Sequence, residues 1–128
     1  MKKIVFFPAI VIVSMFLLMI TGCNYITCDG EVESEIRDIK GFDKIYLAIS
    51  AKVILKQDSL FKVRIEAQPE ILDILLTEVH GNTLKIRYDK CCISRCKEVI
   101  IYLSIPELEK INVSGSGEVI CQQTFNVD

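Results

Sequence analysis

The sequence predicts a small all-β domain with one short helix, and two patterns support this prediction. After residue 41, most of the chain consists of short runs in which apolar and polar side chains alternate, as in strands with one buried face. The segment between Pro69 and His80 instead spaces its apolar side chains as a helix does. Runs of strands with a single helix are typical of a domain built from packed sheets.

Seven short strands are expected in chain order. The run from Phe61 to Glu66 shows the pattern most cleanly, because apolar and charged residues alternate throughout it. Turn-forming residues such as Gln57-Asp58-Ser59 separate the runs. The expected strands cover residues 42–49, 53–56, 61–66, 84–89, 99–105, 111–113 with the alternation resumed at Val119, and one that begins at residues 122–125.

Residues 69–80 are predicted to form a helix of two to three turns. The apolar residues are spaced by one and three positions and share one face: Ile71, Leu72, Leu75, Leu76 and Val79. Pro69 is tolerated in a first helical turn, and Gly81 follows where a helix would end. His80 would lie at the carboxyl end, where the helix dipole favours it. A ligand or catalytic role for His80 is not expected, because the chain has no second histidine.

The amino terminus is a segment of another kind. Lys2 and Lys3 precede an apolar run from Ile4 to Met19, which closes on Ile20-Thr21-Gly22-Cys23. A basic start, an apolar middle and small residues before a cleavage point are typical of a secretory signal peptide. A transmembrane anchor is the alternative, but the 17 residues from Ile4 to Ile20 are fewer than the roughly 20 needed to span a bilayer.

The four residues Ile20-Thr21-Gly22-Cys23 resemble the lipobox of bacterial lipoproteins. The resemblance implies cleavage between Gly22 and Cys23, a diacylglycerol on the Cys23 thiol, and a further acyl chain such as palmitate on the freed amine. Two or more acyl chains anchor a protein stably, whereas one chain binds membranes reversibly. We therefore expect residues 1–22 to be a helical signal peptide and the mature chain to be a lipid-anchored envelope protein. The expected location is the outer membrane, and exposure on the cell surface is an option.

Residues 23–40 are interpreted as the lipidated cysteine followed by an acidic tether. The stretch loosely resembles acidic segments associated with surface display in some Gram-negative lineages, and a solvated linker is the alternative. Removal of residues 1–22 takes away two lysines and no acid, which leaves 13 basic and 17 acidic side chains and a net charge of −4. This charge gives no basis for a nucleic-acid partner.

The chain contains six cysteines, and five remain if Cys23 carries lipid. Cysteines of exported proteins normally form disulfides, and an odd number leaves at least one unpaired or paired between molecules. If the strands at 84–89 and 99–105 form a hairpin that pairs Tyr88 with Val99, Cys91 faces Cys96. Cys28 and Cys121 are candidates for a second pair that joins the linker to the last strands.

The cluster Cys91-Cys92-Ile93-Ser94-Arg95-Cys96 could also hold free thiols or serve as a metal or redox site. Zinc sites usually show two paired Cys-x-x-Cys or Cys/His sets, and a redox pair prefers Cys-x-x-Cys at a helix start. The cluster has neither spacing. No metal or cofactor is therefore expected.

The order of segments after residue 41 carries a family resemblance. It runs from the phenylalanine-led first strand through "Val-Ile-Leu-Lys-Gln" and "Gly-Asn-Thr-Leu-Lys-Ile" to "Val-Ile-Ile-Tyr-Leu-Ser-Ile-Pro-Glu-Leu". Its most specific part extends from Pro106-Glu107-Leu108 to Ser114-Gly115-Ser116-Gly117. Over about residues 41 to 121 this order resembles the head GIN domain of putative auto-transporter adhesins. The resemblance implies a right-handed parallel β-helix or solenoid over residues 41–128, with no known catalytic residues.

In a solenoid each coil is a strand plus a turn, and stacked coils share one apolar interior. Gly115 and Gly117 would permit positive φ at a tight corner, and Ser114 and Ser116 would bond to backbone groups there. Family members usually continue through more coils, so the domain is expected to be shortened or incomplete at its carboxyl end. An open strand edge would then favour self-association.

These expectations favour a non-catalytic, lipid-anchored envelope protein whose surface contacts protein or polysaccharide. A polysaccharide-acting enzyme is one alternative, but it would need two carboxylates roughly 5–9.5 Å apart. The acidic residues form no evident pair in the sequence, and no nucleophile elbow or phosphate loop is present. A cysteine-based redox-sensing module is the other alternative.

Overall fold

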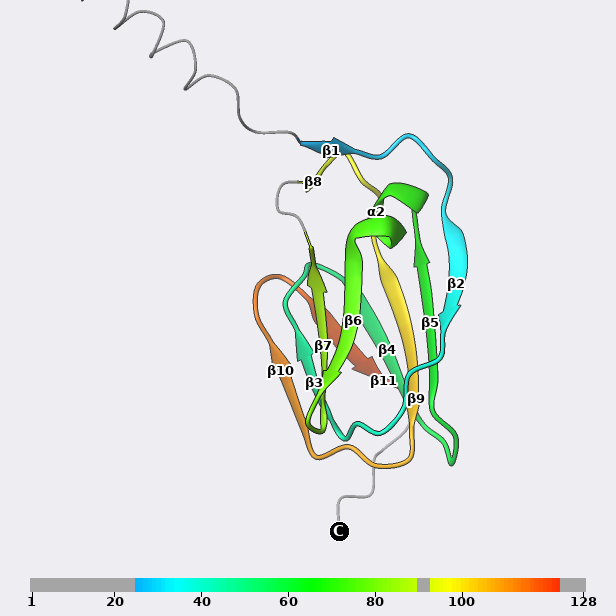
Figure 1. Cartoon of the computed structure of the whole chain (residues 1–128), viewed down its shortest axis with the longest axis vertical. Helices are drawn as coiled ribbons and strands as arrows, with labels where there is room; N and C mark the ends of the chain where they lie inside the picture. Colours follow the sequence, from blue (N-terminus) through cyan, green and yellow to red (C-terminus); the bar gives the residue numbers. More distant parts are fainter. Residues whose placement is uncertain (1–24, 90–92, 123–128) are drawn as a thin grey trace, which may run out of the picture.

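The structure is a computed structural model that describes residues 25–89 and 93–122 (Figure 1). Two sheets face each other, and a two-stranded ribbon lies at the end where residue 25 is found. The described residues contain no helix that is both long enough and apolar enough to cross a bilayer. The predicted signal peptide, its cleavage point and Cys23 lie outside these residues, as do Cys91, Cys92 and residues 123–125 of the strand expected to begin at 122–125.

One sheet has the strand order β10-β3-β7-β6, the other has the order β11-β4-β9-β5-β2, and β1 pairs with β8. The described helix is α2 (Pro69–Ile74). The strands are β1 (Ile26–Thr27), β2 (Glu33–Arg37), β3 (Lys44–Leu47), β4 (Lys52–Gln57), β5 (Lys62–Ala67), β6 (Leu75–His80), β7 (Thr83–Tyr88), β8 (Ile93–Ser94), β9 (Ile100–Ile105), β10 (Lys110–Val113) and β11 (Glu118–Cys121). The prediction of an all-β domain with one short helix is confirmed.

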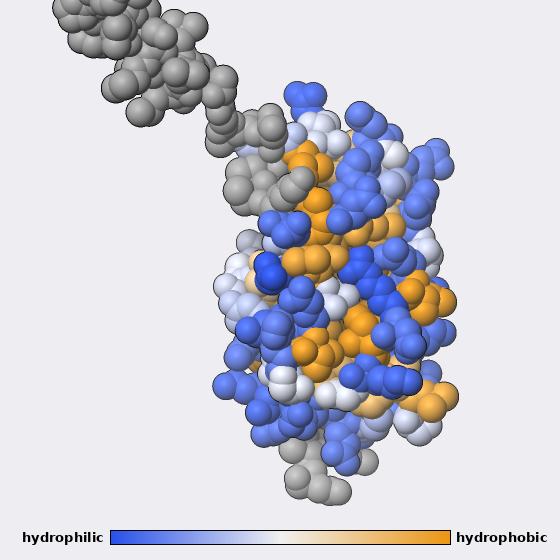
Figure 2. Space-filling view, viewed as in Figure 1, coloured by the Kyte–Doolittle hydropathy of each residue, from blue (hydrophilic) through white to orange (hydrophobic). Residues whose placement is uncertain are grey.

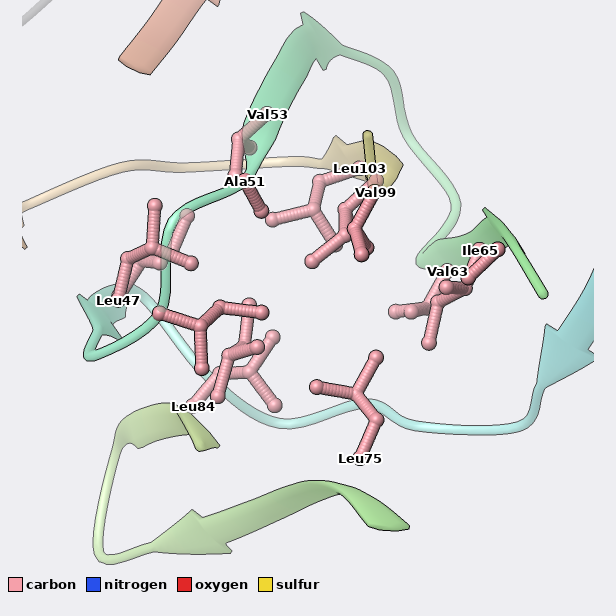
Figure 3. Packing of buried hydrophobic residues seen from close by; sticks show 14 of the residues in the cluster. Leu47, Ala51, Val53, Val63, Ile65, Leu75, Leu84, Val99 and Leu103 are labelled. Atoms are coloured by element: carbon pink, nitrogen blue, oxygen red, sulfur yellow. The ribbon is translucent and has the colours of Figure 1, made fainter. Parts of the chain in front are cut away.

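Alternate side chains of the two sheets fill one apolar core. Figure 3 shows Leu47 and Leu84 of one sheet pointing toward Val53, Val63 and Leu103 of the other. Each of these five side chains is at most 1% exposed. Burying an aliphatic side chain of this size contributes roughly 1.5–3 kcal/mol, so this shared core is the main source of stability.

The two sheets repeat the same parallel register on both sides of the core. Lys110 of β10 lies opposite Lys44 of β3, and Glu118 of β11 lies opposite Lys52 of β4. In both pairs the two partner residues are 66 positions apart in the sequence. The turn at 114–117 therefore lies alongside the turn at 48–51 in the same register. Backbone hydrogen bonds join the two turns at each end, from Ser114 N–H to Leu47 O (2.8 Å) and from Glu118 N–H to Ala51 O (2.9 Å).

On their other side, β3 and β4 pair in parallel with β7 and β9. Here Lys44 lies opposite Thr83, and Lys52 lies opposite Ile100. The connection from β7 to β9, which contains the cysteine cluster, is therefore nine residues longer than the connection from β3 to β4. By contrast, β2, β5 and β6 join the sheets through antiparallel pairs. Both sheets are therefore mixed.

The turn at 114–117 requires glycine at two positions, for a different structural reason at each. Gly115 has φ +98°, as expected for a tight corner. Gly117 does not have positive φ, so that part of the prediction is wrong. A Cβ at Gly117 would lie 2.6 Å from Leu47 Cδ2 and 3.0 Å from Ile49 O, so glycine is required there by the close approach of the chain at residues 47–49.

The predicted helix over residues 69–80 is wrong in its second half. α2 ends at Ile74, and residues 75–80 form β6, which pairs antiparallel with β7. Leu75, Thr77 and Val79 lie opposite inward-facing or half-buried residues of β7, so the same apolar residues also fit a period of two. Gly81, at φ +62°, makes the turn between the two strands. His80 consequently ends a strand, where its Nε2 lies 3.0 Å from Glu78 Oε2.

The described part of the expected tether is folded. Residues 33–37 form β2, which pairs antiparallel with β5 at the edge of the five-stranded sheet, and residues 26–27 form β1. The sequence did not reveal β2 because it has no apolar face. Its one large apolar side chain, Ile36, is 69% exposed.

The expected hairpin between residues 84–89 and 99–105 is also wrong. β7 pairs with β3 and β6, whereas β9 pairs with β4 and β5 in the opposite sheet. The alternation in these segments therefore reflects burial against a common core and not direct pairing.

Gly117→Ala tests the close approach of the two turns. The added methyl group would contact Leu47 and the Ile49 carbonyl, and overpacking of this kind costs about 1–3 kcal/mol. We expect a lower urea midpoint for Gly117→Ala, with Ser116→Ala as the control because Ser116 is exposed in the same turn. Equal midpoints for the two variants would contradict the packing described above.

Candidate functional site

A disulfide ties the amino-terminal segment to the loop before β9. Cys28 is bonded to Cys96, and their Cα atoms lie 4.9 Å apart although 68 residues separate them in the sequence. The predicted pairs Cys91–Cys96 and Cys28–Cys121 are therefore wrong. Cys121 is a free, exposed thiol in β11. The pairing of β1 with β8, in which Ile26 lies opposite Ile93, brings the two cysteine-bearing segments together.

A buried glutamine supports the same junction. Gln68 is 3% exposed and precedes α2. Its Nε2 donates to Gly30 O at 2.7 Å, and its Oε1 accepts from Lys97 N–H at 2.6 Å. Both polar ends of a buried amide are thus paired, and they join the segments that follow Cys28 and Cys96. We call this disulfide together with the Gln68 bridge the clasp.

Glu70 adds a charged contact to the clasp. Its Oε1 accepts from the N–H groups of Asp29 and Gly30, each at 3.1 Å. The N–H groups of Glu70 itself, Asp29 and Gly30 lower the pKa of the Glu70 carboxyl from its ordinary value, against the opposing effect of desolvation. Gly30 is close to Pro69, where an added Cβ would lie 2.7 Å from Pro69 Cδ. The amino-terminal segment therefore fits tightly onto α2.

Arg37 anchors β2 to the transition from α2 to β6. Its guanidinium donates to the carbonyl oxygens of Leu72 (3.0 Å) and Leu75 (2.6 Å) and to Thr77 Oγ1 (3.1 Å). Its Nε donates to Glu35 Oε2 at 2.9 Å. Because Leu72 and Leu75 lie where the helix ends, this arginine satisfies carbonyl groups that the helix leaves free. These contacts assign Arg37 a structural role.

The end of the domain opposite the β1–β8 ribbon contains a hollow of about 240 Å³. Two carboxylates, Asp43 and Glu107, line it together with Phe42, Phe61 and Pro106. Asp43 Oδ1 is buried and has no hydrogen-bond partner. Sequence reasoning missed this pair, because 64 positions separate its members and the register of β3 brings them to one end.

A second hollow, of about 200 Å³, lies on the outer face of the five-stranded sheet. The residues that line it are Ile54, Lys56, Lys62, Arg64, Tyr102, Leu103, Ser104 and Gln122. Arg64 stacks on Tyr102, with Cζ 4.2 Å from the ring centre. We call this site the basic groove.

The face formed by β3, β6 and β7 has a different character. Figure 2 shows apolar side chains along its middle, interspersed with charged ones. Exposed ion pairs such as Arg87–Glu78 (3.6 Å) lie on this sheet. Among residues 25–89 and 93–122, no three His, Cys, Asp or Glu side chains are grouped so that they could hold a metal ion.

Comparison with known proteins identifies the family. Residues 41–128 match the family described as "Putative auto-transporter adhesin, head GIN domain". The chain belongs to this family. The match includes both hollows and most of the two sheets, and it confirms the resemblance drawn from the motifs. No curated protein matches the chain.

Solved structures share the head GIN fold. A putative lipid binding protein from Parabacteroides distasonis ATCC 8503 is 27% identical, with a TM-score of 0.67 over 77% of this chain and 44% of that one. A putative adhesin from Bacteroides fragilis NCTC 9343 is 23% identical, with a TM-score of 0.68 over 73% and 44% of the two chains. The chain thus spans less than half the length of these structures.

Loss of the disulfide should destabilise this head GIN domain. We expect the double variant Cys28→Ser, Cys96→Ser to lose about 4 kcal/mol of unfolding free energy, because a loop of this length would no longer be closed in the unfolded chain. Urea unfolding under oxidising conditions measures the change. Cys121→Ser is the control, since its thiol is unpaired. An unchanged midpoint in the double variant would contradict a stabilising role for the clasp.

Proposed function

We propose that the chain is a lipid-anchored protein of the bacterial envelope whose head GIN domain is a non-catalytic, adhesin-like interaction module. The match of residues 41–128 to the adhesin head family carries this proposal. The lipobox-like residues Ile20 to Cys23, at the end of a signal-peptide pattern, support an anchor at Cys23. The location proposed for the anchor is the outer membrane, with a surface-exposed head as an option that rests on the loose resemblance of the acidic amino-terminal segment to segments associated with surface display.

The clasp defines how such an anchor would orient the domain. Cys23 precedes Cys28 by five residues, and an extended chain spans at most about 3.6 Å per residue. The disulfide would therefore lie within about 18 Å of the lipid attachment point. The β1–β8 end would face the membrane, and the opposite end of the two sheets would point away (Figure 1). The hollow lined by Asp43 and Glu107 lies among the connections before β3 and after β9.

We further propose that the parallel strand pairs are coils of a right-handed solenoid. β10 and β11 are edge strands on the same side of their two sheets, and no strand of residues 25–89 and 93–122 pairs with their outer backbone groups, which a further coil or another copy of the chain would therefore meet. Val113, at 41% exposure, leaves apolar surface at this edge. Self-association through the edge is the expected consequence.

A polysaccharide-acting enzyme is the second candidate function, and the hollow with two carboxylates is the observation that favours it. Glycoside hydrolysis uses such a pair across the scissile bond. The redox-sensing alternative has less support, since Cys96 bonds to a cysteine 68 residues away and not to a neighbour in its cluster.

Reducing-end release from polysaccharides separates a binding module from an enzyme. We expect the full chain to release no more sugar ends than a buffer blank, and Asp43→Asn with Glu107→Gln to leave this result unchanged. Release that disappears in this double variant but persists in Glu109→Gln would identify an enzyme. Glu109 is a suitable control because it is exposed and lies outside the lining of the hollow.

Replacement of Cys23 tests the anchor. We expect the wild-type chain in the membrane fraction, with residues 1–22 removed and acyl mass on Cys23 by mass spectrometry. Cys23→Ser should abolish lipidation and cleavage, because the acyl acceptor is lost. Cys121→Ser is the matched control and should remain lipidated and membrane-bound. A wild-type chain with an unmodified Cys23 and residues 1–22 retained would contradict the lipoprotein proposal.

A further inference from the structure

The basic groove is built from three neighbouring strands. Ser104 of β9 lies directly between Lys56 of β4 and Lys62 of β5 in the register of the sheet. The buried neighbours Leu55, Val63 and Leu103 face the core, so the two lysines and the serine face outward. Adjacent strands are about 4.8 Å apart, so the lysine Cα atoms lie roughly 10 Å apart with a small side chain between them.

An aromatic wall closes one side of the groove. Tyr102 lies two residues before Ser104 on β9, and Arg64 lies opposite Tyr102 on β5. The guanidinium of Arg64 is stacked on the Tyr102 ring and also lies 3.8 Å from Glu66 Oε1. Stacking restricts both side chains, so the wall is ordered before any ligand binds.

The charge of the groove is opposite to that of the protein. Its lining contains three basic side chains and no acidic one, whereas the whole chain has a net charge of −2. Arg64 is partly neutralised by Glu66, but among the described residues no carboxylate lies within ion-pair distance of Lys56 or Lys62. Two unpaired lysines beside a fixed arginine create a local positive potential that attracts an anion.

We propose that the basic groove binds an anionic sugar unit of an acidic polysaccharide. Carboxylate or sulfate groups would pair with Lys56 and Lys62, hydroxyl groups would reach Ser104 and Gln122, and the apolar side of the sugar would contact Tyr102 and Ile54. A volume of about 200 Å³ is below the roughly 300–1,000 Å³ of drug-sized ligand pockets. It suits a single unit of a polymer that lies across the open sheet.

The surroundings favour a polysaccharide over other anionic polymers. Nucleic-acid binding rests on several phosphate contacts at once, and a chain of net negative charge with one small basic site is poorly suited to it. Under the proposed anchor at Cys23, the β1–β8 end would face the membrane, and the groove on the side of the domain would lie away from the lipid surface. The inference rests on the proposed role in envelope interactions, but polymer binding itself does not require the lipid at Cys23.

Binding of the full chain, purified in detergent, to immobilised polymers tests the proposal. The polymers are polygalacturonate for carboxylates, heparin for sulfates and dextran as the neutral arm. We expect binding to one or both acidic polymers, none to dextran, and weakening with added salt. Lys56→Gln with Lys62→Gln should weaken binding about tenfold or more, because two charge-assisted contacts are lost. The two acidic arms distinguish carboxylated from sulfated ligands.

The matched control is Lys85→Gln with Lys110→Gln. It removes the same charge from exposed lysines of β7 and β10 in the other sheet, and binding should be unchanged. Equal weakening by both double variants, or no binding to either acidic polymer, would overturn the proposal. Binding to immobilised glycerol phosphate, the headgroup of phosphatidylglycerol, that is lost in Lys56→Gln, Lys62→Gln, without polymer binding, would assign the groove to lipid instead. Cys23→Ser should keep polymer binding, so failure of the anchor and failure of the groove are distinguishable.

Discussion

Burial of alternate side chains in a core shared by two sheets is the constraint on which the rest of the structure depends. A shift of one residue in the pairing of β4 with β9 would turn Val53 and Leu55 toward solvent and Lys52 and Ile54 toward the core. The register is fixed further by the common offset of β3–β10 and β4–β11, because a slip in one sheet would strain the turns that connect it to the other. Gly117 allows these turns to approach closely.

The same constraint determines what the outer faces present. Once Leu55, Val63 and Leu103 face inward, Lys56, Lys62 and Ser104 must face outward, and the strand order β4-β9-β5 makes them neighbours. The basic groove therefore requires no special loop or strained backbone. It follows from core packing plus the choice of residues at solvent-facing positions, which core packing leaves free.

The sequence predicted those parts of the fold that depend on local pattern. Alternation identified β3, β4, β5, β7, β9 and β10, and the motif order identified the family. Residues 75–80 were misread because Leu75 and Val79 share one face in a helical stripe and also in a strand, and pairing with β7 decides between the two. The Cys28–Cys96 bond, the Gln68 bridge and the basic groove join residues that are distant in sequence, so only the strand order reveals them.

The clasp determines which strand carries a force that is applied through the amino-terminal segment, by which the proposed anchor would hold the domain. A force on the amino-terminal segment reaches the domain at Cys28, which is covalently joined to the loop leading into β9. β9 is a central strand that pairs with both β4 and β5, whereas β2, the next strand after Cys28, is an edge strand that pairs with β5 alone and is otherwise held by the contacts of Arg37. Without the disulfide the force would act on the short β1–β8 pair and on the hydrogen bonds of Gly30 to Gln68 and Glu70, and then on the edge strand β2. With it, the load passes directly to the strand with two ladder partners, and the outer face that carries the basic groove keeps its register under tension.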